Sequence, residues 1–120
     1  MNEELPNATW KQRLISWVSG SLRPLTVSGN SMMPALNDRD TVLYRPMSLW
    51  TPRETVKIGD IVFVAHPYMQ SVKIMKRVRE IDHEGKLFLV GDNEAESTDS
   101  RTLGWFSPKD VGGKVVCRLK

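Results

Sequence analysis

The stretch Gly59-Asp60-Ile61-Val62-Phe63-Val64-Ala65 decides the class of fold. Its Gly-Asp pair is a turn signal, and the apolar residues that follow are β-branched, aromatic or small. A nearly continuous apolar run of this length, bounded by turn signals, is typical of a buried strand. The chain is therefore expected to be built around a sheet.

Further segments of β-forming composition lie on both sides of this run. Polar turns separate them, such as Asn37-Asp38-Arg39-Asp40 and Asp82-His83-Glu84-Gly85. Short strands at irregular spacing indicate a mostly-β fold with a curled or barrel-like antiparallel sheet. The expected strands are residues 25–27, 41–44, 61–65, 71–81, 86–90 and 111–119, with long loops at 45–58 and 91–104.

The first 24 residues are expected to form a tail and one short amphipathic helix, ahead of a single domain over residues 25–120. Residues 1–8 are polar and expected to be loose. The apolar residues that follow recur at the spacing of one helical face. A helix docked on the core is favoured, and a weak peripheral membrane contact or a partner contact stays open. The apolar face comprises Trp10, Leu14, Trp17 and Val18.

The composition excludes several classes of protein. The 120 residues are 40% hydrophobic and 26% charged, as in an ordinary globular domain with one modest core. The net charge of +3 comes without a basic cluster interleaved with aromatic residues, so no nucleic-acid partner is expected. The single cysteine, Cys117, excludes an intrachain disulfide. With no apolar run of roughly 18 residues and no signal-peptide core, a cytoplasmic location is expected.

A second stretch, Val27-Ser28-Gly29-Asn30-Ser31-Met32-Met33-Pro34-Ala35-Leu36, carries the first candidate for chemistry. It places Ser31 just after a Gly-Asn pair, the residue types that most readily adopt tight backbone. The methionines supply flexible apolar surface beside the hydroxyl. A serine presented in this way suits a nucleophile, but the same residues form ordinary turns, so the stretch alone favours a turn.

A serine nucleophile needs a general base, and histidine is a poor candidate here. His83 lies in a polar turn, and His66 ends a strand pattern before Pro67. No Asp is recognisably placed to orient His66, so a Ser-His-Asp triad is weakly supported. The two histidines also lack the neighbours of a metal site, and no metal or cofactor is expected.

Lysine is the alternative base. Its amine must be neutral to accept a proton, which requires a pKa lowered from about 10.4 towards 7 or 8, as burial can cause. Lys76 has apolar neighbours in sequence, and Lys73 belongs to the same stretch. An offset of three places the two side chains on opposite faces of a strand. Composition does not choose between them, and solvated edge-strand cations are the simpler interpretation of both.

The Ser31 stretch is followed in order by Gly59-Asp60-Ile61-Val62, Lys76-Arg77-Val78, residues 91–101 and Gly112-Gly113-Lys114-Val115. In this order and spacing they resemble the boxes of the signal peptidase family of Ser-Lys proteases. The resemblance implies a serine endopeptidase with Ser31 as nucleophile and Lys76 as general base. It covers residues 25–119, nearly the whole chain.

Two shorter motifs narrow the resemblance to one branch of the family. Ala65-His66-Pro67-Tyr68 and residues 96–105 occur in a short chain without the family's membrane anchor. They resemble the nickel-type superoxide dismutase maturation proteases. The resemblance implies a substrate, the nickel superoxide dismutase precursor, whose N-terminal leader is removed to expose nickel ligands.

The same resemblance implies roles for residues of the 91–101 segment. Ser97 is expected to hydrogen-bond the Lys76 amine and to aim it at the nucleophile. Asp99 and Arg101 are expected to form a structural salt bridge that holds the loop.

The oxyanion hole is the weakest part of the resemblance. Gly29 stands where some family members have a serine whose hydroxyl donates to the oxyanion. The Ser31 backbone N–H is left with one unidentified companion, and a missing donor costs about 3 kcal/mol in the transition state. The candidate oxyanion donors are Ser28 and Asn30, and the candidate residues of the substrate pocket are Met32 and Met33.

Two other functions stay open. A self-cleaving peptidase of the SOS-repressor type shares the Ser-Lys fold, but it needs a cleavable segment and a DNA-binding domain, which the 30 residues before Ser31 do not offer. A non-catalytic β module would instead bind a peptide or an acidic partner through Lys73, Lys76, Arg77 and Arg79.

Overall fold

The computed structural model describes residues 5–9, 22–47, 56–69, 71–96 and 98–119. Its strands pair in the order β1-β2-β6-β3-β4-β5, and every pair of neighbours is antiparallel. Within these residues β1 and β5 are not paired, so the sheet is curled but not closed into a barrel. The strands are β1 (Arg23–Thr26), β2 (Thr41–Pro46), β3 (Ile61–Ala65), β4 (Lys73–Ile81), β5 (Leu87–Val90) and β6 (Val111–Leu119).

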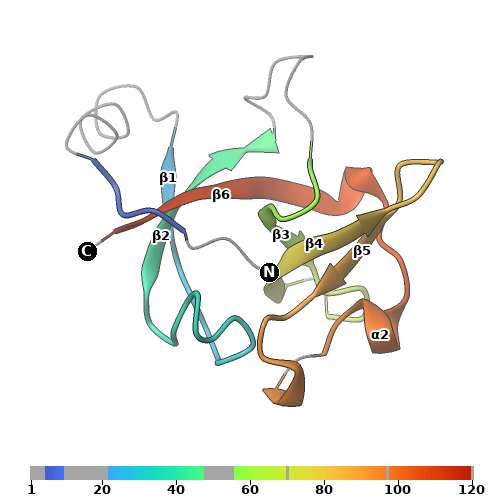
Figure 1. Ribbon diagram of the computed structural model, residues 1–120, viewed down its shortest axis with the longest axis horizontal. Helices are drawn as coiled ribbons and strands as arrows, with labels where there is room; N and C mark the ends of the chain where they lie inside the picture. Colours follow the sequence, from blue (N-terminus) through green and yellow to red (C-terminus); the bar gives the residue numbers. More distant parts are fainter. Residues whose placement is uncertain (1–4, 10–21, 48–55, 70, 97, 120) are drawn as a thin grey trace.

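The long strand β6 joins the two halves of the molecule (Figure 1). Residues 113–119 of β6 pair with β2, and residues 111–114 pair with β3 on its other side. The ring of Phe63 on β3 meets the ring of Tyr44 on β2 edge to face, with centroids 4.7 Å apart. Gly113 passes directly beneath these rings, and a Cβ there would lie 2.8 Å from a carbon of each. The Gly-Gly pair of β6 is therefore required by close packing.

The apolar run at residues 61–65 is a buried strand, as predicted. Consecutive side chains of β3 enter two different core clusters, because successive side chains of a strand point to opposite faces. Val62 and Val64 pack with Val78 in one cluster, while Ile61 packs in the other. The second cluster contains Met32, which lies immediately after Ser31.

The residues near the N-terminus correct one expectation. Residues 1–8 were expected to be loose, but Asn7 forms a parallel bridge with Arg118 of β6. The Ala8 backbone N–H donates to the Arg118 carbonyl at 2.7 Å, and the Arg118 N–H donates to the Pro6 carbonyl at 2.8 Å. This segment covers the edge of β6 beyond the end of β3, where unpaired backbone groups would otherwise lie (Figure 1). The helix expected from Trp10 onwards lies outside the described residues.

The segment 91–104 is also more ordered than the long loop expected from its polarity. It contains a 3₁₀ turn, η2 (Glu94–Glu96), and a short helix, α2 (Ser100–Leu103). A further 3₁₀ turn, η3 (Pro108–Asp110), leads into β6. Asp99 caps α2 by accepting the Arg101 backbone N–H. The polarity of the segment did not reveal this local hydrogen bond. Among the described residues, no helix is long and apolar enough to cross a membrane.

Candidate active site

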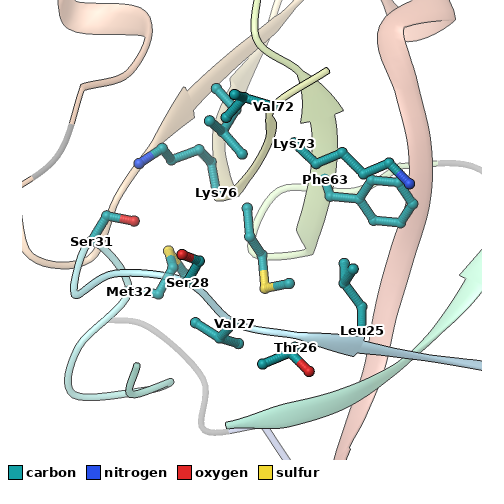
Figure 2. A pocket seen from close by; sticks show the side chains of 12 residues that line it. Leu25, Thr26, Val27, Ser28, Ser31, Met32, Phe63, Val72, Lys73 and Lys76 are labelled. Carbon is teal, nitrogen blue, oxygen red and sulfur yellow. The ribbon is translucent and has the colours of Figure 1, made fainter. Parts of the chain in front are cut away.

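A cavity of about 240 Å³ opens between β1, the turn that follows it, and the start of β4 (Figure 2). The hydroxyl of Ser31 and the amine of Lys76 face each other at one end of this cavity. The opposite end is formed by Lys73 and Phe63. The remaining lining residues are Leu25, Thr26, Val27, Ser28, Met32, Val72, Ile74 and Met75.

The Ser31 turn is anchored at its base by backbone hydrogen bonds. The Val27 N–H donates to the Asp40 carbonyl at 2.7 Å, and the Arg39 N–H donates to the Val27 carbonyl at 2.8 Å. Gly29 has a φ of 87°, in the left-handed region that favours glycine. Its N–H donates to the Asp38 side chain at 2.8 Å. A residue with a side chain would be strained at position 29 by this backbone.

Asn93, in the loop that follows β5, holds the Ser31 turn by hydrogen bonds. Its backbone N–H donates to the Ser31 carbonyl at 2.8 Å, and its side-chain amide donates to the Asn30 carbonyl at 3.1 Å. Two segments far apart in sequence are therefore joined at the serine itself. From the sequence, Asn93 was one residue of the 91–101 motif, and no contact was predicted for it.

Lys76 is a buried lysine, with a relative exposure of 3%. Its neighbour across the sheet is Val62, at the centre of the first core cluster. Burial lowers the pKa of the Lys76 ammonium below its ordinary value; the negative charge of Asp99 opposes this shift and the positive charge of Arg101 adds to it. A buried amine with a lowered pKa, at the same end of a cavity as a hydroxyl, has the environment that a general base needs.

Lys73 differs from Lys76 in its surroundings. It is exposed, and its ammonium lies 5.3 Å from the centroid of the Phe63 ring. The two lysines lie on opposite faces of β4 and reach the same cavity because no described strand covers this part of its outer edge. Burial thus distinguishes two cations that composition left equivalent.

The Asp99–Arg101 pair organises the loop after β5. The two side chains form an ion pair with an N–O distance of 2.6 Å. Asp99 is 1% exposed and also accepts the Gly91 backbone N–H at 2.8 Å. Arg101 reaches outward to Glu94, at 3.1 Å. The charge of Asp99 is therefore balanced locally, which limits its influence on Lys76.

The other candidate residues differ in their relation to the cavity. Ser28 and Met32 line it, and Met32 is buried. Asn30 and Met33 are exposed and are not among its lining residues. His66 lies in the β3–β4 turn, where its Nδ1 accepts the Tyr68 N–H at 3.1 Å. Ser97 lies outside the described residues.

A buried ion pair next to Lys76 was not anticipated from the sequence. Arg77 is 3% exposed, and its Nε and Nη2 donate to the two carboxylate oxygens of Asp92, each at 2.9 Å. Its Nη1 donates to the Gly59 carbonyl at 2.8 Å. These contacts join three of the motifs that resemble the signal peptidase family, namely those that contain Gly59, Arg77 and Asp92. The motif letters were the only signal, since nothing in their spacing indicates which residues meet.

Comparison with protein families agrees with this arrangement. The sequence profile of the family described as Signal peptidase, peptidase S26, matches residues 14–81 and 81–120. The chain belongs to this family, which implies a signal-peptidase-like serine peptidase. A comparison with curated proteins gives no significant match.

Proposed function

We propose that the chain is an endopeptidase that uses Ser31 as nucleophile and Lys76 as general base. One observation carries the proposal: a serine hydroxyl and a buried lysine with a lowered pKa face one cavity in a chain of the signal peptidase family. A solvated lysine would be protonated at neutral pH and unable to act as a base. Burial removes that obstacle without any histidine.

The proposed reaction proceeds through an acyl-enzyme. Neutral Lys76 accepts the Ser31 proton while Oγ attacks the scissile carbonyl carbon. The resulting ammonium then donates this proton to the leaving amine as the C–N bond breaks. In the second half, Lys76 accepts a proton from a water molecule, which attacks the ester carbonyl and releases the new carboxylate. Lys76 finally returns the proton to Ser31, so the enzyme is regenerated.

The oxyanion would be stabilised by the Ser31 backbone N–H and by a second donor. Of the two candidates, Ser28 lines the cavity, whereas Asn30 does not. Ser28 is therefore the better candidate, and its hydroxyl replaces the donor that Gly29 lacks. Ser97 retains its proposed role of aiming the Lys76 amine.

The substrate would bind as an extended strand in this cavity. Among the described residues, no strand pairs with the outer edge of β1 or, on the side of β5, with residues 73–76 of β4. Both edges border the cavity, so a peptide between them can add main-chain hydrogen bonds to either. The apolar lining, including Met32 and Met75, suits small or apolar side chains near the scissile bond.

The proposed substrate is the precursor of a nickel-type superoxide dismutase, from which a short N-terminal leader would be removed. The support for this choice is the resemblance of residues 65–68 and 96–105 to the maturation-protease branch. The reaction itself needs no metal or cofactor on the enzyme.

The test is incubation of the purified chain with a nickel superoxide dismutase precursor, followed by sequencing of the new N-terminus. Ser31→Ala and Lys76→Ala should each abolish cleavage, while the matched surface variants Ser71→Ala and Lys86→Ala should cleave normally. Cleavage that persists in both site variants would disprove the Ser-Lys mechanism. Cleavage of other precursors but not this one would disprove only the substrate. Mass analysis of the incubated chain alone tests for self-cleavage.

A further inference from the structure

The cavity has a one-sided charge. Of the described residues that line it, two are charged and both are lysines; none of these described residues is acidic. Lys76 must be neutral to act as a base, so it contributes no lasting charge in the active form. Lys73 therefore provides the persistent positive charge of the cavity, at the end away from Ser31 (Figure 2).

Among the described residues Lys73 has no carboxylate partner, and Figure 2 shows its ammonium beside the Phe63 ring, at the end of the cavity away from Ser31. Its ammonium lies 5.3 Å from the Phe63 ring centroid, a cation–π contact that restrains a side chain which would otherwise move freely in solvent. The ion pairs formed between described residues do not include Lys73. By contrast, Lys114 on β6 is paired with Asp60 at 3.3 Å. Lys73 thus keeps its capacity to bind an anionic group.

We infer that Lys73 forms a subsite that selects an acidic side chain, Asp or Glu, in the bound peptide. The inference rests on the proposed function, because the peptide is the one whose scissile bond lies at Ser31. An extended strand rises about 3.3 Å per residue, and Lys73 precedes Lys76 by three positions on β4. A peptide lying along β4 would place the selected side chain about two to four residues from the scissile bond.

The size of the preference follows from the partial exposure of the ammonium. Ion pairs at exposed sites are weak, and pairs beside an apolar wall are somewhat stronger. The change from Gln to Glu at the selected position should therefore improve peptide binding by about two- to fivefold at low salt. The preference should weaken as salt is added, because the site is open to solvent.

The test uses the Ser31→Ala variant, which keeps the cavity but does not cleave, and a library of synthetic 10-residue peptides of random sequence. Bound peptides are recovered and sequenced. With Ser31→Ala alone, we expect enrichment of Asp or Glu at one position of the bound peptides. This enrichment should disappear when Lys73→Gln is added and should remain when Lys73→Arg is added. Adding Lys73→Glu should reverse the preference towards Lys or Arg. Lys109→Gln, on the exposed turn η3, is the matched control and should leave the enrichment unchanged.

An absence of acidic enrichment, or an enrichment that survives Lys73→Gln, would overturn the subsite. So would a library from which nothing is retained. The outcome is separate from that of the cleavage assay. If the wild-type chain cleaves no precursor but the enrichment depends on Lys73, the subsite stands as part of a peptide-binding groove and the proposed catalysis fails. If cleavage occurs and the enrichment is absent, the subsite alone fails.

Discussion

Two consecutive residues of β4, Lys76 and Arg77, are buried to the same degree but differ in how their charged groups interact with the surroundings. Each has a relative exposure of 3%, and they point to opposite faces of the strand. Arg77 is held by three hydrogen bonds, two of them to the buried carboxylate of Asp92. For Lys76 burial is the largest effect, and it lowers the pKa.

The difference shows that burial alone does not determine the role of a cationic side chain. A guanidinium bound in two places by a carboxylate is a structural connection, because neither partner can leave without exposing the other as an unpaired buried charge. An amine with a lowered pKa loses its proton at lower pH than a solvated lysine does, and that is the property a general base needs. The same strand therefore carries an ion-paired cation on one face and, on the other, a cation whose charged form is disfavoured by burial.

The largest expected effect separates activity from stability at Lys76. Lys76→Met should reduce the rate of peptide cleavage by about 10³-fold or more, since a general base contributes about 10²- to 10⁴-fold. The free energy of unfolding should rise, by about 1 kcal/mol, because a buried amine is replaced by an apolar side chain. Chemical denaturation with a cleavage assay measures both.

The pH dependence of this stabilisation has a definite sign. The folded-state pKa of Lys76 is lowered, so protonation disfavours the folded state, and the penalty is largest below that pKa and disappears as pH rises towards the ordinary lysine value. The stability gain of Lys76→Met should therefore shrink as pH rises. A gain that grows with pH would contradict the lowered pKa.

The next effect concerns stability alone. Arg77→Met should lower the free energy of unfolding by about 3 to 5 kcal/mol, because it leaves the carboxylate of Asp92 buried without its partner. The double variant Arg77→Met/Asp92→Leu should recover most of the loss, since no charge is then left in the core. The cleavage rate per folded molecule should change far less than in Lys76→Met. A double variant as unstable as the single one would show that the pair is not the cause.

The smallest expected effect is a displacement of the pH profile. The charge of Asp99 raises the pKa of Lys76 and that of Arg101 lowers it, so Arg101→Met should raise the pKa of Lys76. Activity requires the neutral amine, so the rising limb of kcat/KM should move to higher pH, with activity a few-fold lower at pH 7 and recovering in alkali, since one pKa unit corresponds to about tenfold. Arg79→Met, on the exposed part of β4, is the control and should leave the limb in place. A uniform loss at every pH would indicate a purely structural role.

Much of the fold could be predicted because it depends on local patterns. The apolar run at 61–65, the turn at 82–85 and the closing strand after Gly112-Gly113 all carry signals within a few residues. The ordered segment at 91–104 could not be predicted in this way. Its helix is capped by Asp99, and the same carboxylate binds the Gly91 N–H. This polar segment was predicted to be a loop because the sequence shows that its side chains are polar but not which groups they hydrogen-bond.

For the candidate site, the sequence by itself determined the identity of the groups: a serine on a tight turn, lysines in an apolar stretch, and the order of motifs that corresponds to the signal peptidase family. Only the tertiary structure decided which lysine is buried and how the serine turn is held by Asn93. The physical reason is that a pKa shift depends on solvent exclusion by segments distant in sequence. The neighbours of Lys76 along the chain show that it can be buried, but the sheet and the loop after β5 are what exclude the water.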